Sequence, residues 1–194
     1  MPVNNRMQSL LEAIADNADA IDEKASQQLI ESIKKSKRIF ITGAGRSGFV
    51  GRAFAMRLMH LGFNVFMVGE TTTPAIEKGD LLIAISGSGE TNSTVLIASE
   101  AKKKNAKIIA ITSREKSALA KFADVIVNIR GRIDLKKNRD YLARQVAGIH
   151  EPLAPLGTLF ELTAMIFLDA IIEELMVRER KTEKAMKARH TNLE

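Results

Sequence analysis

The chain of 194 residues contains no cysteine and no tryptophan, and it has only one tyrosine. The absence of cysteine excludes disulfides, thiolate metal sites and a cysteine nucleophile. Proteins that bind single-stranded nucleic acid stack the bases on aromatic side chains, which are scarce here. The net charge is +6, but the basic residues are scattered apart from those at 178–189. We therefore expect no nucleic-acid partner, because a mild positive field suits an anionic metabolite better.

A long hydrophobic run without charges is also missing. The longest apolar stretch, 156–177, is interrupted by four acids, Glu161, Asp169, Glu173 and Glu174. A helix that spans a membrane rarely carries so many charges, so this stretch predicts a buried helix instead. Residues 1–6 lack the apolar segment of a secretory signal. We therefore expect no membrane partner and a cytoplasmic protein.

The chain does contain an alternation of strand-like and helical segments. Apolar runs typical of strands occur at 38–42, 63–68, 81–85, 107–112 and 125–129, and helical patterns lie at 4–36, 49–60, 91–104, 117–122 and 156–180. This alternation predicts an α/β fold, in which helices cover both faces of a parallel sheet. We expect five strands, doubly wound in the flavodoxin-like order 2-1-3-4-5. We also expect one domain of residues 1–194, with an N-terminal helical arm (1–36), a sheet core (37–130), and a long C-terminal helix with its tail (152–194).

A glycine-rich loop, Gly-Ala-Gly-Arg-Ser-Gly at 43–48, comes after the first expected strand. Its three glycines match GxGxxG, and Glu70 stands about where a dinucleotide-binding fold carries its ribose-binding acid. A dinucleotide site is therefore one interpretation. The loop also contains Arg46 and Ser47, whose side chains suit an anion.

A second loop, Ser-Gly-Ser-Gly-Glu-Thr at 86–91, comes after the apolar run 81–85 and opens a helical pattern. Glycines allow a sharp turn, and hydroxyl groups together with the free N–H groups of a helix start make an anion site. No lysine is present, so the P-loop pattern is absent. In the expected strand order the first and third strands are neighbours, so both loops open into one crevice. Two such loops favour a sugar phosphate over a dinucleotide.

The pairing of these two loops resembles the sugar isomerase (SIS) domain. Residues 155–161, Pro-Leu-Gly-Thr-Leu-Phe-Glu, and 189–194, Arg-His-Thr-Asn-Leu-Glu, are similar to the P-M-G-S-L-F-E and R-H-A-N-L-E motifs of the 6-phospho-3-hexuloisomerase family. The departures, at Leu156, Thr158 and Thr191, are conservative. The resemblance covers nearly the whole chain.

This resemblance implies an enzyme that interconverts D-arabino-hex-3-ulose 6-phosphate and D-fructose 6-phosphate, a step of the ribulose monophosphate pathway used for formaldehyde fixation. Members of the family act without a metal ion or cofactor and are usually tetramers. Two alternatives remain open: another phosphosugar isomerase, such as one for arabinose 5-phosphate, and a non-catalytic sugar-phosphate-binding protein. The second usually carries a DNA-binding helix-turn-helix, for which residues 1–36 are too few and too acidic.

Moving a carbonyl between neighbouring carbons through an enediol requires a base and an acid. Glu161 is the first candidate for the base, because its helical neighbours are apolar and a desolvated carboxylate is a stronger base. Alternatively, Glu161 is only an early acid of its helix, stabilised by ~0.3–1 kcal/mol through the helix dipole. The resemblance favours catalysis, and it alone makes His190 the second group, in its own subunit's site or a neighbour's. Glu151 is the second choice for the base, whereas His60 is expected to be a cation at a helix end far from the phosphate.

The expected substrate-binding residues come from the two loops and are Gly45, Arg46, Ser47, Ser86, Ser88, Glu90 and Thr91. The four hydroxyl groups would hold the phosphate, although Ser88 or Thr91 could also cap the following helix, which is worth ~1 kcal/mol. Arg46 is expected to contact phosphate or sugar oxygens, and Glu90 to accept from sugar hydroxyls. Otherwise these two are solvated loop charges.

Overall fold

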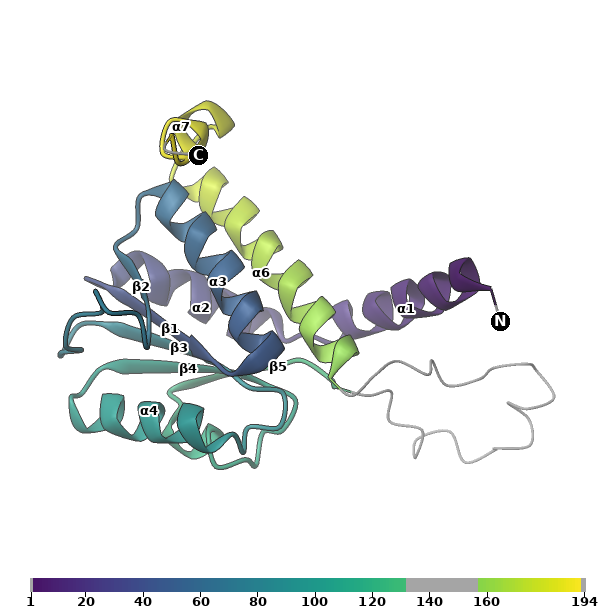
Figure 1. The fold of residues 1–194 in the computed structure, drawn as a ribbon, viewed down its shortest axis with the longest axis horizontal. Coiled ribbons are helices and arrows are strands. Elements are labelled where there is room, and N and C mark those ends of the chain that lie inside the picture. The colour runs from purple at the N-terminus through teal and green to yellow at the C-terminus, as the bar shows by residue number, and fades with distance from the viewer. Residues whose placement is uncertain (1, 132–156, 193–194) are drawn as a thin grey trace.

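The computed structural model describes residues 2–131 and 157–192, whose strands form one parallel five-stranded sheet (Figure 1). The strands are β1 (Ile39–Gly43), β2 (Val65–Met67), β3 (Leu81–Ile85), β4 (Lys107–Thr112) and β5 (Val125–Asn128). They are hydrogen-bonded in the order β2-β1-β3-β4-β5, and every neighbouring pair is parallel. The predicted doubly wound α/β fold and its strand order are therefore confirmed.

The central strand β3 is buried along its whole length. Leu81, Ile83 and Ile85 belong to the hydrophobic core on one face of the sheet. Leu82 and Ala84 belong to the core on the other face. A strand that is covered on both faces needs no alternation with polar residues, which explains the continuous apolar run in the sequence. The second glycine-rich loop thus starts from a fully buried strand.

The helices cover both faces of the sheet. They are α1 (Val3–Ala18), α2 (Glu23–Lys35), α3 (Gly45–Leu61), α4 (Asn92–Lys103), α6 (Thr158–Arg178) and α7 (Glu183–Lys187), with a 3-10 turn at Ala120–Phe122 where the sequence predicted a short helix. In Figure 1, α2, α3 and α6 lie on one face of the sheet and α4 lies on the other. α3 and α6 lie side by side and pack against each other. Among the helices that the structure describes, none is long and apolar enough to cross a membrane.

Helix α3 begins at Gly45, several residues earlier than the sequence predicted. Gly45 has a φ of +56°, and this left-handed conformation turns the chain from strand into helix within two residues. Close packing adds a second constraint, because a Cβ on Gly48 would lie 2.7 Å from the carbonyl oxygen of Gly43. Arg46 and Ser47 are therefore held in the first turn of a helix rather than in a free loop.

The basic C-terminal tail, for which the sequence predicted no further helix, contains the short helix α7. The hydroxyl of Thr182 caps it by accepting a hydrogen bond from the N–H of Ala185 at 3.2 Å. Met186 is buried in the core on the α3 side of the sheet. The burial of this apolar residue helps to hold the basic tail against the body of the protein.

The N-terminal helix α1 extends away from the sheet as an arm (Figure 1). Its second half is fixed by Asn17, whose side chain donates to the Arg130 carbonyl at 2.8 Å and to the Thr163 hydroxyl at 3.2 Å. The same side chain accepts a hydrogen bond from the Arg130 N–H at 3.0 Å. The helix also leaves three apolar side chains exposed, those of Val3, Met7 and Leu11.

Candidate active site

The two glycine-rich loops lie next to each other at the carboxyl edge of the sheet. β1 ends at Gly43 and β3 ends at Ile85, and these two residues are partners in the parallel pairing of the strands. Loops 43–48 and 86–91 therefore leave neighbouring strands at the same level. This is the switch point of the doubly wound sheet, where ligands bind in this fold class.

The start of α3 supplies unpaired N–H groups to this edge. Ala44, the N-cap residue, makes no side-chain capping hydrogen bond, and the first turn contains no acid. The N–H groups of a first helical turn have no partner within the helix, and they mark the positive end of its dipole. Ser47 adds a half-buried hydroxyl in the same turn. This helix start therefore suits an anion.

The start of α4 is built in a similar way. Thr91 is its N-cap residue, yet its hydroxyl makes no capping hydrogen bond and instead lies 3.1 Å from the Ser86 hydroxyl. Ser86 is buried and also accepts a hydrogen bond from the Gly89 N–H at 3.2 Å. The exposed Ser88 accepts from the N–H of Glu90 at 3.2 Å. The simple capping role considered for Ser88 and Thr91 is thus absent, and a second helix start is free to face an anion.

Residues outside the loop hold its backbone in this shape. Gly89 has a φ of +66°, and a Cβ at this position would lie 2.1 Å from the Ser117 hydroxyl. The Ser113 N–H donates to the Gly87 carbonyl at 3.1 Å, and a Cβ on Gly87 would lie 3.0 Å from the Phe160 ring. The sequence did not indicate these supporting contacts, since no local pattern links residues so far apart in the chain. A binding loop held in this way is preorganised for its ligand.

Glu161 reaches this edge of the sheet from the first turn of α6. Its side chain is only 13% exposed, and its Oε2 accepts a short hydrogen bond from Nε of Arg46, which is 61% exposed. The apolar surroundings expected for Glu161 are therefore incomplete, because a guanidinium lies on its carboxylate. The pair forms because α3 and α6 pack side by side with their starts together (Figure 1).

Two other acids are already engaged. Glu90 accepts a hydrogen bond from the Ala118 N–H at 3.0 Å, so one of its oxygens secures the loop to the next segment. Glu70, whose position favoured a dinucleotide, forms an ion pair with Arg52 of α3 at 2.5 Å. The observation that supported a ribose-binding acid thus has another physical reason.

Comparison with known proteins agrees with this geometry. Residues 32–135 match the SIS domain. The chain belongs to this family. It is 37% identical to 3-hexulose-6-phosphate isomerase of Bacillus subtilis over 194 residues, which cover 100% of both chains. It is 49% identical to 3-hexulose-6-phosphate isomerase of Methanocaldococcus jannaschii over 165 residues, 85% of this chain and 82% of that one.

A solved structure is similar to this SIS domain over almost its full length. The crystal structure of a hypothetical protein of Methanococcus jannaschii, for which a molecular function of 3-hexulose-6-phosphate isomerase was inferred, has a TM-score of 0.77 and 42% sequence identity. The match covers 97% of each chain. The resemblance found in the sequence is therefore confirmed.

His190 lies far from the two loops of its own SIS domain. Its ring contacts that of His60, with centroids 5.2 Å apart, near the end of α3. From Arg46 to His60 this helix rises roughly 21 Å. Among the described residues no third His, Asp or Glu joins the two histidines as a metal site would require. Glu151, the second choice for the base, lies outside the described residues.

His60 differs from the cation expected at a helix end. It is 4% exposed, and burial together with the charges of His190 and Arg57 lowers its pKa. His60 is therefore uncharged at neutral pH, because burial disfavours the charged imidazolium.

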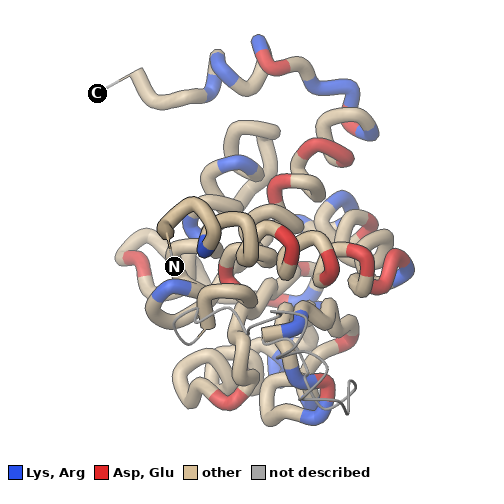
Figure 2. Tube along the Cα trace, turned by 90° about the vertical axis from the view of Figure 1, so that its right-hand side faces the viewer, with Lys and Arg blue, Asp and Glu red and all other residues tan. Residues whose placement is uncertain are grey.

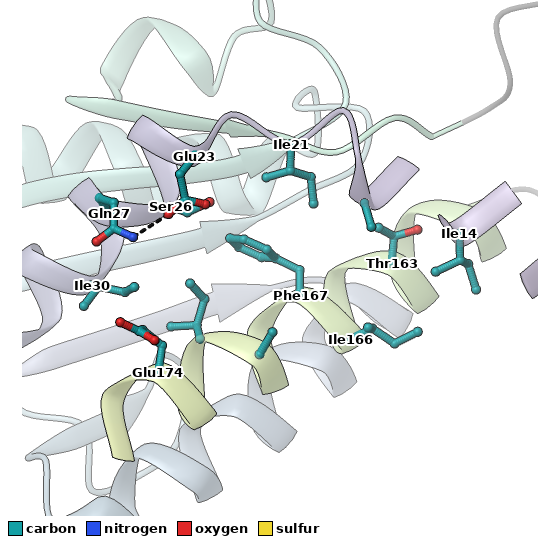
Figure 3. A pocket seen from close by; sticks show the side chains of 13 residues that line it. Ile14, Ile21, Glu23, Ser26, Gln27, Ile30, Thr163, Ile166, Phe167 and Glu174 are labelled. Carbon is teal, nitrogen blue, oxygen red and sulfur yellow. Dashed lines mark hydrogen bonds between the residues drawn. The ribbon is translucent and has the colours of Figure 1, made fainter. Parts of the chain in front are cut away.

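A separate hollow of about 550 Å³ lies between α1, α2 and α6 (Figure 3). Most of its lining is apolar, including Ile14, Ile30 and Phe167. Its polar lining includes Glu23, Gln27 and Glu174. None of the predicted substrate-binding residues lines it.

Proposed function

We propose that this chain is a 6-phospho-3-hexuloisomerase, which interconverts D-arabino-hex-3-ulose 6-phosphate and D-fructose 6-phosphate. The observation that carries the proposal is the meeting of two uncapped helix starts, α3 and α4, with the Arg46–Glu161 pair. The first feature suits a phosphate, and the second offers a carboxylate for proton transfer. The names of the relatives give the substrate its length and the position of its carbonyl.

In this proposal the phosphate lies between the two loops. The backbone N–H groups at Gly45 and at the start of α4 would donate to its oxygens, together with hydroxyl groups of both loops, those of Ser47, Ser86, Ser88 and Thr91. Ser86 and Thr91 already share a hydrogen bond, so their free lone pairs and protons would be oriented before the ligand arrives. Glu90 has one oxygen left for a sugar hydroxyl, because its other oxygen holds the Ala118 N–H.

Glu161 would act as the base. It takes the proton from C2 of the 3-ketose while the C3 carbonyl oxygen receives a proton, which gives an enediol. The proton then returns to C3, and the C2 hydroxyl loses its proton to become the new carbonyl. Hydrogen-bond donors close to the reacting oxygens would stabilise the negative charge that develops on them.

While His190 lies against His60, a role for it calls for a second copy of the chain, since α3 rises roughly 21 Å between Arg46 and His60. We propose a homo-oligomer, a tetramer as in the resembling family, in which His190 serves a neighbour's site. Three exposed apolar side chains at helical spacing on the α1 arm, those of Val3, Met7 and Leu11, support association, because contiguous exposed apolar patches often mark contacts between proteins. The ribulose monophosphate pathway and the cytoplasm are the expected setting.

Proton exchange tests the proposal directly. Fructose 6-phosphate is incubated with the EDTA-treated protein in deuterated water, and the proton NMR spectrum is followed. We expect loss of the C3 proton signal together with new signals of the 3-hexulose phosphate. Glu161→Gln should lower the rate by about 10²–10⁴, the usual contribution of a general base. Glu173→Gln, an exposed acid of the same helix, is the matched control and should leave the rate unchanged.

Other outcomes assign other functions. Exchange with arabinose 5-phosphate but not with fructose 6-phosphate would identify a different phosphosugar isomerase. Protection against heat by fructose 6-phosphate without any exchange would identify a sugar-phosphate-binding protein. Near-full activity of Glu161→Gln would make Glu161 structural and turn the search for the base to Glu151.

A further inference from the structure

Arg46 occupies an unfavourable place for a cation in the absence of an anion. It is the second residue of α3, where the helix dipole presents its positive end. The N–H groups of the same turn point the same way and lack a side-chain cap. A guanidinium at this position is stabilised only by a negative charge brought to it from elsewhere.

In the structure that charge is Glu161. Nε of Arg46 donates to Oε2 of Glu161, and this is the one ion pair of Arg46 with the residues that the structure describes. A guanidinium has five N–H donors in a rigid fork, so most of them are left for another acceptor. The Arg46 side chain is 61% exposed, whereas that of Glu161 is 13% exposed. Arg46 is therefore the partner that is free to move.

A phosphate group would compete with the carboxylate for this guanidinium. At neutral pH a phosphate monoester carries a charge of about −1.5 to −2 and has three strong acceptor oxygens. Arginine binds such a group through two parallel hydrogen bonds. The uncapped start of α3, with Ser47 in the same turn, favours a phosphate directly beside Arg46.

We propose that Arg46 exchanges partners when substrate binds: it neutralises Glu161 in the free protein and turns to the phosphate group in the complex, which frees Glu161 to accept a proton. The inference rests on the proposed function only in taking a sugar phosphate as the ligand. The Glu161 oxygen that accepts the Arg46 N–H is occupied by this hydrogen bond, and it becomes available to a substrate proton when Arg46 turns away. The phosphate, remote from the reacting carbons, then activates the base through its own binding energy.

The exchange predicts a characteristic pattern in phosphate binding. Inorganic phosphate is titrated into the wild-type protein and into Glu161→Gln, Arg46→Gln and the double variant, and binding is followed by ³¹P NMR. Removing the competing carboxylate should tighten binding by about two- to fivefold, the range of a partly exposed ion pair. Arg46→Gln should weaken binding by at least about tenfold, because a charge-assisted hydrogen-bond pair is lost. In the Arg46→Gln background, Glu161→Gln should leave the affinity for phosphate unchanged.

The last comparison separates the exchange from a general charge effect. If Glu161→Gln tightens phosphate binding equally with and without Arg46, the carboxylate only repels the anion, and the inference is overturned. Unchanged or weaker binding by Glu161→Gln overturns it as well. Arg52→Gln, which removes another exposed cation of α3 that pairs with Glu70, is the matched control and should keep the wild-type pattern.

The binding cycle and the isomerase assay fail independently. If the protein is an active isomerase but the effects of Glu161→Gln and Arg46→Gln on phosphate affinity are additive, the exchange is overturned and the proposed function stands. If the four phosphate affinities follow the predicted pattern but fructose 6-phosphate loses no proton to solvent, the change of partner by Arg46 is supported, and the protein has another phosphorylated ligand. A wild-type protein that binds neither phosphate nor fructose 6-phosphate would overturn the exchange.

Discussion

The ring of His190 lies against the ring of His60, with centroids 5.2 Å apart and the planes tilted by 31°. The contact joins the segment after α7 to the last turn of α3. Two imidazolium ions at this separation would repel each other, so the contact favours at least one neutral ring. The basic end of the chain runs along the same side of the molecule, and Figure 2 shows Lys and Arg residues along it.

The first prediction concerns stability against acid. Burial, and after it the charges of His190 and Arg57, lowers the pKa of His60 in the folded protein. A histidine in the unfolded chain binds its proton near pH 6.5. In the folded protein the lowered pKa of His60 means that the proton binds only at a lower pH. Proton binding therefore favours the unfolded chain, and stability should fall as the pH drops below about 6.5, until the lowered folded pKa is passed.

Thermal unfolding between pH 5 and pH 8 measures this effect. His60→Gln should flatten the acid side of the curve. His190→Gln is the matched control: it removes one charge but keeps the burial, so it should reduce the acid loss without abolishing it. An acid loss that persists unchanged in His60→Gln would contradict the assignment.

The second prediction concerns the buried hydroxyl of Ser86. Ser86→Ala removes the partner of the Thr91 hydroxyl and one of the two acceptors of the Gly89 N–H, which keeps the Ser86 carbonyl at 3.1 Å. The loss of an ordinary intramolecular hydrogen bond costs about 0.5–1.5 kcal/mol. Urea unfolding should show this loss, and the affinity for phosphate should fall with it. Ser88→Ala is the control, because Ser88 is exposed and accepts its hydrogen bond from an exposed N–H; an equal loss for both variants would show that burial does not matter here.

The third prediction concerns Gly89. Both Gly89 and Gly69 have a positive φ, of +66° and +97°, so alanine at either position costs roughly 1–2 kcal/mol in backbone strain. A Cβ at Gly89 would also collide with the Ser117 side chain, whereas nothing lies within 4 Å of a Cβ at Gly69. Gly89→Ala should therefore lower the free energy of unfolding clearly more than Gly69→Ala and should also weaken phosphate binding. Equal effects in denaturant unfolding would contradict the packing argument.

The fold could be predicted from the sequence because its signals are local. The apolar run 81–85 indicates a strand buried on both faces, and the hydroxyl and glycine residues of 86–91 indicate a tight loop directly after that strand. The strand order then places both loops at one edge of the sheet. The same local reasoning places the start of α3 too late, because the glycines of 43–48 favour a loop although the chain enters the helix at Gly45.

The contacts of the candidate site could not be predicted, because they join distant parts of the chain. Arg46 and Glu161 are 115 positions apart and meet only because α3 and α6 pack side by side. Glu161 therefore has a cationic neighbour that its helical spacing did not indicate. The prediction of a charged His60 fails for the same reason, since spacing along one helix cannot reveal burial by α7 or contact with His190.

The fourth prediction separates a role of His190 in its own subunit from one in a neighbour's. In one chain the contact with His60 holds His190 at the opposite end of α3 from Arg46 and Glu161. If His190 serves a neighbour's site, His190→Gln and Glu161→Gln are each inactive alone, yet a mixed oligomer contains sites with an intact Glu161 from one subunit and an intact His190 from another. Random mixing in equal amounts, after reversible dissociation, should restore about a quarter of the wild-type activity in a symmetric assembly.

The control is a mixture of Glu161→Gln with a double variant that carries both changes, because no site in it regains Glu161. Proton exchange from fructose 6-phosphate before and after mixing measures the result. Activity that stays at the level of the single variants after subunit exchange would place His190 in its own subunit's site and would require the α7 segment to leave His60. Full activity of His190→Gln alone would leave this histidine with a structural role against α3, and Glu161 would need another acid to protonate the oxygens of the enediol.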